Sequence, residues 1–304
     1  MVNKPPTSVN QQLTTDNGIL FGAFPPNDCM KQSSDNKAIP MTSVNSGKER
    51  EVAPDVMYYT NQIVNLVMIG GAHGDWVLVD AGMPKSADKI IRVAEDRFGK
   101  DKAPSALLLT HGHFDHVGSI VELLKTWNVP VFAHPFEFPY LTGQKAYPEP
   151  DTSVEGGLLA KISSIYPIEP VNIKERLSPL PADGSVPFLP GWKWIHTPGH
   201  SPGQVAFFRE TDRLLLSADA FVTVKQDSMY RVLVQKQQVC GPPVYLTTDW
   251  DAAYASVKTL AALNPNIVVA GHGTAMGGNE LAGGLNELVQ NWKEAAVPSH
   301  GKFV

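Results

Sequence analysis

The stretch "LLLTHGHFDHVGS" (107–119) gathers three histidines and one aspartate within six positions, directly after an apolar run. His111 and His113 are two residues apart, so in an extended chain their side chains point to the same side. Asp115 and His116 follow at the expected turn into a helix. Such an arrangement can offer two neighbouring sets of ligands to two metal ions. Chance is a poor explanation, because the whole chain has only nine histidines.

Three further segments place a histidine or aspartate beside small residues just after an apolar run. They are "HTPGHSPG" (196–203), "LSADAF" (216–221) and "VAGHGT" (269–274). Glycine and alanine let the backbone come close to an ion. Taken singly, His200, Asp219 and His272 would more often be structural residues, but together with the first stretch they complete a ligand shell.

The cysteine content restricts the kind of metal site. Only Cys29 and Cys240 are present, far apart in the sequence, which favours neither a disulfide framework nor a thiolate cage. A metal ion would therefore be held by nitrogen and oxygen.

The composition of the chain limits which binding partners and which cellular location can be expected. The chain has 304 residues, 43% of them hydrophobic, and a formal net charge of −5. It contains no run of Lys and Arg suited to a phosphate backbone, so no nucleic-acid partner is expected. It contains no uninterrupted apolar stretch of membrane-spanning length, so no membrane partner is expected either. Residues 1–25 lack the order of a secretory signal, which favours the cytoplasm, with the periplasm or secretion left open for a trimmed chain.

The composition of the chain changes near residue 50. Residues 1–50 are rich in polar residues and proline, with one apolar island, "GILFGAF" (18–24). We expect an extended N-terminal arm that is partly disordered and that could clasp a second subunit in a homodimer. Residues 51–304 are expected to form a single catalytic domain.

Short apolar runs alternate with helical patterns in both halves of that domain. The first half predicts strands over 63–69, 76–80, 106–110 and 129–133, and helices over 87–98 and 119–127. The second half predicts strands over 192–196, 204–208, 213–219 and 266–270, and helices over about 249–263 and 280–295. Two similar halves of this kind indicate an α+β protein with two sheets packed face to face and helices outside.

Together, these motifs resemble those of the metallo-β-lactamase superfamily. The signature consists of "HGHFDH" (111–116) followed by His200, Asp219 and His272, and it is preceded by "LVDAG" (78–82). The resemblance implies a four-layer αββα sandwich with a dinuclear metal site at one edge. It implies the following assignments: His111, His113 and His200 as ligands of the first ion, Asp115, His116 and His272 as ligands of the second, Asp219 as the bridge, and Asp80 as the residue that orients a ligand imidazole.

The resemblance also implies a chemistry. The aspartate at position 219 is similar to the bridge of the glyoxalase II and lactonase branches, which the true β-lactamases lack. Two divalent ions, most simply zinc with iron or manganese as alternatives, would hold a bridging hydroxide as the nucleophile. Asp115 would act as the catalytic residue that orients the hydroxide and carries its proton to the leaving group.

The substrate is expected to be a small molecule: an ester, a lactone such as an acyl-homoserine lactone, or a thioester. A glutathione thioester is less favoured, because only Lys293 and Lys302 supply basic charge after His272. Lactonases of the superfamily often carry a tyrosine three residues after the bridging aspartate, where this chain has Val222. Tyr230 and Tyr245 are the candidates to line the pocket instead.

A second class of enzyme shares the fold. Sulfur dioxygenases that act on persulfides hold a single iron with two histidines and an aspartate. The metal content per chain separates this alternative from a dinuclear hydrolase.

Overall fold

The computed structural model describes residues 13–14, 20–21, 29–34, 42–71, 74–154, 163, 166–224 and 237–304. Its larger sheet has seven strands that follow one another in sequence order. The first four are antiparallel and the last four are parallel, with β6 shared by both groups. The strands are β3 (Glu49–Ala53), β4 (Val56–Asn61), β5 (Val64–Gly70), β6 (Trp76–Val79), β7 (Ala106–Leu108), β8 (Val131–Ala133) and β9 (Leu177–Pro179).

The second sheet has five strands in the order β10-β11-β12-β15-β16. Only the pair β12 and β15 is parallel. The strands are β10 (Trp192–His196), β11 (Val205–Arg209), β12 (Leu214–Ala218), β15 (Ile267–Ala270) and β16 (Met276–Gly277). Two smaller ribbons pair β1 (Leu13–Thr14) with β2 (Leu20–Phe21) and β13 (Val222–Val224) with β14 (Gln237–Cys240).

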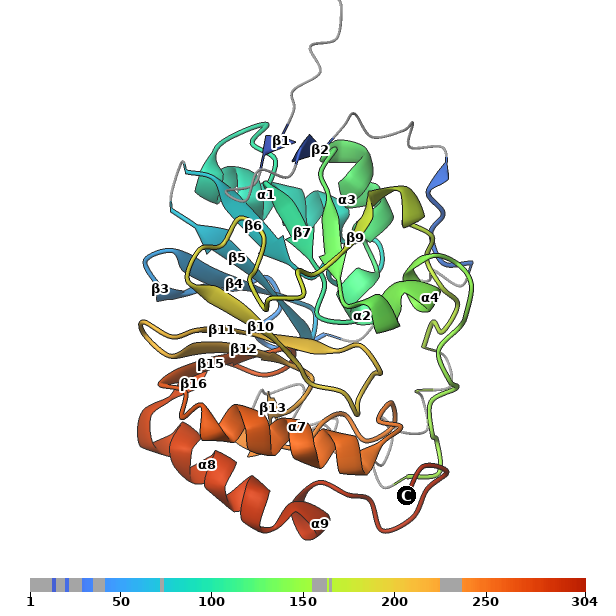
Figure 1. Ribbon diagram of the computed structural model, residues 1–304, viewed down its shortest axis with the longest axis vertical. Helices are drawn as coiled ribbons and strands as arrows, with labels where there is room; N and C mark the ends of the chain where they lie inside the picture. Colours follow the sequence, from blue (N-terminus) through green and yellow to red (C-terminus); the bar gives the residue numbers. More distant parts are fainter. Residues whose placement is uncertain are drawn as a thin grey trace, which may run out of the picture.

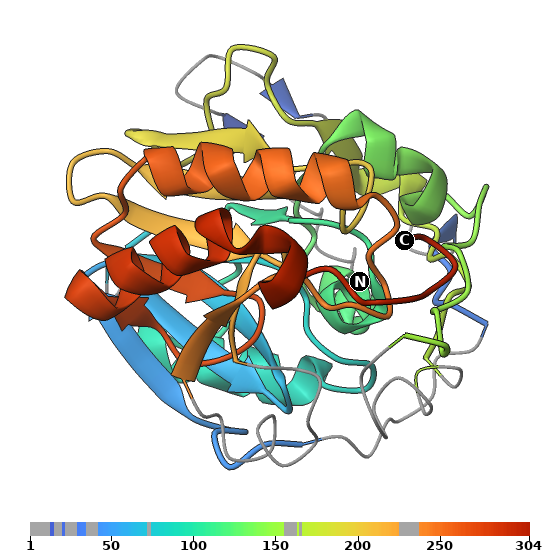
Figure 2. The ribbon, with the colours of Figure 1, turned by 90° about the horizontal axis from the view of Figure 1, so that it is seen from below.

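Helices cover the outer face of each sheet, which gives four layers (Figure 1). Above the seven-stranded sheet lie α1 (Ala87–Phe98) and α3 (Ile120–Thr126). Below the five-stranded sheet lie α7 (Trp250–Ala262) and α8 (Gly278–Gln290), side by side in Figure 2. The described residues also form several short elements: α2 (Phe114–Val117), α4 (Phe138–Leu141), α9 (Trp292–Ala295), and the 3-10 turns η2 (Pro135–Glu137) and η4 (Lys174–Arg176).

The alternation of apolar side chains along each strand explains the layers. In β6, Trp76 and Leu78 pack under the helices, whereas Val77 and Val79 face the other sheet. Side chains alternate along β12 in the same way, and Leu215 packs in the core between this strand and the helices α7 and α8. Successive strand residues point to opposite faces, and here both faces are buried, which is why these strands are continuously apolar. The four-layer αββα sandwich expected from the sequence is present.

Most of the elements expected from the sequence are present within a residue or two of their predicted bounds. The prediction contained none of the strands β3, β4, β9 and β16 of the two sheets and neither of the two smaller ribbons. The helix expected over 280–295 is two helices, α8 and α9, separated at Asn291. The break lets the buried Trp292 stack against Tyr254, with ring centroids 5.2 Å apart, so a tertiary contact overrides the helical periodicity.

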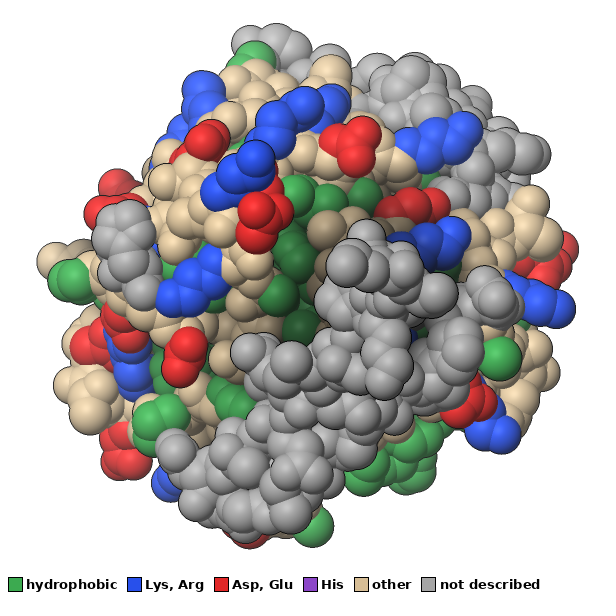
Figure 3. All heavy atoms as spheres, turned by 90° about the horizontal axis from the view of Figure 1, so that it is seen from above, with side chains coloured by type: hydrophobic (Ala, Val, Ile, Leu, Met, Phe, Trp, Pro, Cys, Tyr) green, Lys and Arg blue, Asp and Glu red, His purple; other side chains and the backbone are tan. Residues whose placement is uncertain are grey.

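The larger sheet begins at Glu49, at the border of the predicted arm. Among the described residues, no helix combines the length and apolarity needed to cross a bilayer. Figure 3 shows the face of the molecule seen from above, where basic and acidic side chains are interspersed among the described residues.

One side chain joins the two sheets at the edge where the polar motifs gather. Asn65 of β5 donates hydrogen bonds from Nδ2 to the carbonyl oxygens of Ala270 (2.9 Å) and Gly273 (2.6 Å). Its own amide N–H donates to the carbonyl of Gly271 at 2.8 Å, and its Oδ1 accepts from the Thr60 hydroxyl. The loop that carries His272 is therefore held by a strand of the other half of the chain.

Candidate metal centre

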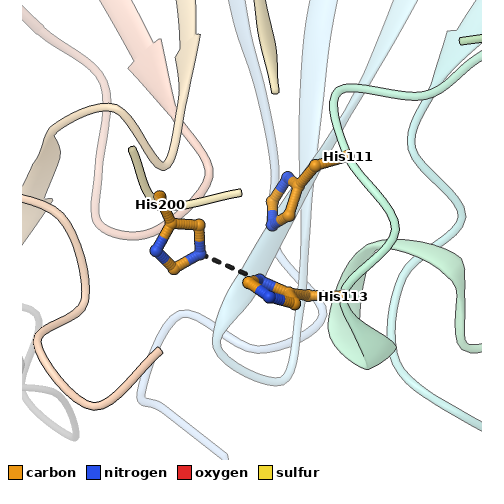
Figure 4. A group of neighbouring side chains, drawn as sticks. All are labelled: His111, His113 and His200. Carbon is orange, nitrogen blue, oxygen red and sulfur yellow. Dashed lines mark hydrogen bonds between the residues drawn. The ribbon is translucent and has the colours of Figure 1, made fainter. Parts of the chain in front are cut away.

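The ends of strands β7, β10, β12 and β15 bring the predicted ligands to one edge of the sandwich. His111 and His113 leave β7 in an extended segment, and α2 begins directly after His113. Figure 4 shows these two rings on one side of the centre and the ring of His200 opposite them. Nδ1 of His113 and Nε2 of His200 are 2.9 Å apart. One nitrogen from each of His111, His113 and His200 lies within 4.8 Å of the others, so the three can share one cation.

Asp219 lies between this group and a second one. A bulge in β12 and a left-handed backbone at Ala218 (φ 49°) direct the aspartate to the edge of the sheet. Its Oδ2 lies 3.4 Å from Nε2 of His200, 3.7 Å from Nε2 of His116 and 3.2 Å from Nε2 of His272. Ligand atoms about 2.0–2.1 Å from one zinc ion lie about 3.3 Å from one another, so these spacings suit shared ions.

The second group consists of Asp115, His116 and His272. Oδ2 of Asp115 lies 3.3 Å from Nε2 of His272 and 4.0 Å from Nε2 of His116. One ligand atom from each of the three residues lies within 4.8 Å of the others. The structure thus brings all seven predicted ligands together in two groups with Asp219 between them.

The outward nitrogen of each of four imidazoles is fixed by a partner. Nδ1 of His111 contacts the Thr110 hydroxyl at 3.0 Å, and Nδ1 of His116 contacts Oδ2 of Asp80 at 2.8 Å. In the other two loops, the partners are the hydroxyl of Thr247 for His200 (3.1 Å) and the carbonyl oxygen of Ile63 for His272 (3.0 Å). These contacts leave Nε2 of every one of the four rings directed at the centre.

The chemistry of the donor set fits bound cations. Nε2 of His111, Nε2 of His116 and Oδ1 of Asp219 are buried and have no hydrogen-bond partner within the described structure. Buried polar atoms are normally paired, and one ligand atom from each of these three residues lies within 4.8 Å of the others, so the group fits a partner that accepts lone pairs. Imidazole and carboxylate ligands suit zinc, iron and manganese alike.

The electrostatics of the centre also favour cations. Burial, together with the neighbouring histidines, holds the pKa of His111 and His113 well below the usual range, so these rings keep free lone pairs. Burial alone would lower the pKa of His272, but Asp219 and Asp115 raise it to about 10. Without a cation, the carboxylates therefore hold a proton on His272. A bound metal ion would replace that proton, so its binding releases protons.

Asp80 occupies the orienting position that the sequence predicted. Its backbone is left-handed (φ 64°), a conformation that aspartate tolerates better than most residues. Oδ1 accepts from the amide of Thr110, and Oδ2 accepts from the Thr110 hydroxyl, both at 2.8 Å. The carboxylate thus fixes both the strand end and the ring of His116.

Replacing Asp80 by alanine is expected to weaken the affinity for the ion bound by His116 by about 10–100-fold, because the imidazole loses the partner that sets its orientation. Competition titration of Zn²⁺ against a chromophoric chelator measures this change. Asp88→Ala, at an exposed aspartate in the first turn of α1, is the matched control and should bind Zn²⁺ like the unaltered protein. Equal affinities in the two variants would contradict the orienting role.

Two tyrosines lie beside Asp115, and only one of them was predicted. Tyr245 is buried, and its ring lies 5.7 Å from that of Tyr166, to which it is also hydrogen bonded. Burial raises the pKa of both hydroxyls, and the Asp115 carboxylate raises it further. The other predicted pocket residue, Tyr230, lies outside the described residues. That either tyrosine meets substrate stays a prediction.

His134 and His196 form a stacked pair away from the ligand groups. Their rings are 4.2 Å apart, and Nε2 of His196 contacts the Pro202 carbonyl oxygen at 2.9 Å. Burial and the neighbouring His196 lower the pKa of His134 to about 4. His134 is therefore neutral at ordinary pH, and the stacked pair serves packing.

Two residues around the centre were not predicted from the sequence. Thr247 is 47 residues from the ring it contacts, and nothing in its local sequence marks it. Glu137 stands out in the apolar run "PFEFPYL" (135–141), where a lone charge is itself a signal that was not used.

Comparison with known proteins gives the family. The profile of the metallo-beta-lactamase superfamily matches residues 59–272. The chain is 44% identical to "Probable metallo-hydrolase YflN" of Bacillus subtilis (strain 168) over 252 residues, which cover 82% of this chain and 96% of that protein. It is 25% identical to "Hydroxyacylglutathione hydrolase GloC" of Haemophilus influenzae over 201 residues, 65% of this chain and 79% of that protein.

A solved structure supports the same fold. The metallo-beta-lactamase family protein TTHA1429 of Thermus thermophilus superposes with a TM-score of 0.54 at 20% identity, covering 80% of this chain and 81% of its own. At this identity the likeness concerns the fold alone. The profile match spans most of the chain and both groups of ligands, so the protein belongs to the metallo-β-lactamase superfamily.

Proposed function

We propose that the protein is a dinuclear metal-dependent hydrolase that cleaves the acyl bond of a small ester, lactone or thioester. The observation that carries this proposal is the position of Asp219. Its Oδ2 lies within 3.7 Å of imidazole nitrogens from both ligand groups, as a bridging carboxylate requires. The relatives support hydrolysis, since YflN is named as a metallo-hydrolase and GloC as a hydroxyacylglutathione hydrolase.

Two bound divalent cations, with zinc as the expected metal, would supply a water of lowered pKa and a Lewis acid for the substrate carbonyl. His111, His113 and His200 would hold one of them, and Asp115, His116 and His272 the other, with Asp219 shared. The same groups could hold iron or manganese.

Asp115 is the residue of the centre best suited to move a proton. It lies at the start of α2, and its Oδ2 faces Nε2 of His272. Burial would raise the pKa of this carboxyl, but the nearby His116 and His272 hold it below its usual value, so the group is ionised at neutral pH. Its carboxylate oxygen that does not ligate the ion can accept a proton from an attacking water and return it to the leaving oxygen or sulfur.

Tyr166 and Tyr245 are proposed to assist at the leaving group. Their pKa values are raised, so both hydroxyls stay protonated and can donate hydrogen bonds. Both feel the charge of the Asp115 carboxylate. They are proposed to replace the tyrosine that lactonases often carry three residues after the bridge, where this chain has the buried Val222. A lactone such as an acyl-homoserine lactone, or a neutral ester, is therefore proposed ahead of a glutathione thioester.

The first test is the metal content of protein purified without added metal, measured by mass spectrometry of the elements. Two ions per chain are expected. Hydrolysis is then measured on an acyl-homoserine lactone, an aryl ester, a glutathione thioester and a β-lactam, with lactone or ester turnover expected and no turnover of the β-lactam. His300→Ala, at an exposed histidine near the C-terminus, is the control for His272→Ala, which should lose the second ion.

One iron per chain, with oxygen consumption on a persulfide and no hydrolysis, would overturn the proposal in favour of a sulfur dioxygenase. The second ligand group favours the hydrolase over that outcome, because Asp115, His116 and His272 could hold a second cation.

A further inference from the structure

A fully buried carboxylate lies outside the two ligand groups. Glu137 ends the turn η2 after β8, and none of its surface is exposed. Leaving a carboxylate unpaired at such a place would be costly. The hydrogen-bond donors around this carboxylate therefore indicate its role.

Four uncharged donors converge on the two oxygens of Glu137. Oε2 accepts from the amide of Gly112 at 3.0 Å and from the hydroxyl of Tyr147. Oε1 accepts from the hydroxyl of Ser201 at 2.8 Å and from the amide of Gly203 at 2.7 Å. Oε2 thus binds Gly112 and Tyr147, whereas Oε1 binds the single loop of Ser201 and Gly203.

Three of these donors belong to the two loops that carry the first ligand group, and the fourth, Tyr147, lies against the ring of His113. Gly112 stands between His111 and His113, and Ser201 directly follows His200. Figure 4 shows the two loops approaching the centre from opposite sides. Glu137 bonds both of them, so it links the loop of His113 to the loop of His200, and the ring nitrogens of these two histidines are 2.9 Å apart.

The glycines of the two loops permit this close approach. A Cβ added to Gly112 would lie 2.8 Å from the Tyr147 hydroxyl oxygen, and one added to Gly203 would lie 2.8 Å from Cγ of Glu137. Tyr147 is held in place by stacking on Tyr140, with centroids 3.9 Å apart, and its ring lies 4.3 Å from that of His113. The packing around the carboxylate is therefore tight on both sides.

We propose that Glu137 is a positioning residue for the first metal ion: without touching the ion, it holds the loop of His111 and His113 at the correct distance from the loop of His200. This inference rests on the proposed function in so far as both require the metal centre. It assigns the residue to the first ion, because Gly112 lies between two ligands of that ion and Ser201 and Gly203 lie in the loop of the third. None of the four donors lies in α2, which carries Asp115 and His116, or in the loops of Asp219 and His272.

The test measures Zn²⁺ affinity of the full chain by competition with a chromophoric chelator, one site at a time. The His272→Ala background keeps the first ligand group, and the His113→Ala background keeps the second. Glu137→Gln is placed in each, because glutamine preserves the shape but turns an NH₂ group toward one pair of donors. Glu280→Gln, at an exposed glutamate in α8, is the matched control.

We expect Glu137→Gln to weaken Zn²⁺ binding about 10–100-fold in the His272→Ala background and to leave it unchanged in the His113→Ala background. Ser201→Ala removes a single donor and should give a smaller loss in the first background only. This variant keeps the proposal testable if Glu137→Gln does not fold.

A merely structural role for Glu137 would lower the melting temperature and weaken both sites alike, which would overturn the proposal, as would unchanged binding in the His272→Ala background. Failure of the proposed function looks different, because the unaltered protein would then bind fewer than two ions or hydrolyse nothing in the panel.

Discussion

Replacing Asp219 by alanine is expected to release both metal ions, whereas replacing His272 is expected to release one. Oδ2 of Asp219 faces nitrogens of both ligand groups, so its loss removes one ligand from each ion and leaves the two cations to repel each other without a carboxylate between them. The loss of affinity at each ion should exceed the loss of about 10–100-fold that follows from disturbing a residue behind a ligand. Elemental analysis after dialysis, together with hydrolysis rates, measures the effect.

The two variants are expected to differ in the number of metal ions that each chain keeps. Asp219→Ala should fall below one ion per chain, His272→Ala should keep one, and Asp183→Ala, at an exposed aspartate, should keep two. Full retention of both ions in Asp219→Ala would show that the carboxylate is not shared.

Gly271→Ala is expected to be nearly as damaging, although it adds a single methyl group. The added Cβ would lie 2.0 Å from Oδ1 of Asp219 and 3.0 Å from Cε1 of His116. The backbone of the same loop is fixed by Asn65, so the aspartate must move instead. We expect loss of both ions and of activity, with overpacking costing about 1–3 kcal/mol of folding stability.

The control for this variant is a glycine with free space around it. Gly283 is exposed on α8, and an added Cβ there would meet nothing within 4 Å. Gly283→Ala should therefore raise the free energy of unfolding by about 0.5–1 kcal/mol through helix propensity and leave the metal content unchanged. Denaturant unfolding and metal analysis of the two variants distinguish a local clash from a general sensitivity to alanine. A Gly271→Ala protein with two ions and full activity would refute the packing argument.

The sequence predicted the layers of the fold and the ligand candidates for a common reason. Strand residues alternate between two buried faces, and the chemistry-bearing residues follow directly at the strand ends, so both signals are local. The role of Asp80 came instead from the resemblance to the metallo-β-lactamase superfamily, through "LVDAG" (78–82).

Contacts between distant segments could not be predicted in this way. The partner of His200 is Thr247, and the partners of Glu137 include Gly203, which is 66 residues away. Neither spacing has a period that a sequence pattern could reveal. The break at Asn291 was missed for a related reason, because it depends on the stacking of Trp292 against a different helix.

The hydrogen bonds that Asn65 donates to the segment around His272 have a consequence for the order of folding and metal binding. They join β5 to a loop 205 residues later in the chain, and that loop carries the ligand His272. Contacts between such distant residues form late in folding, because the long intervening segment must first be closed. We therefore expect the protein to bind its full complement of metal only late in folding, so that metal uptake reports the completion of the fold.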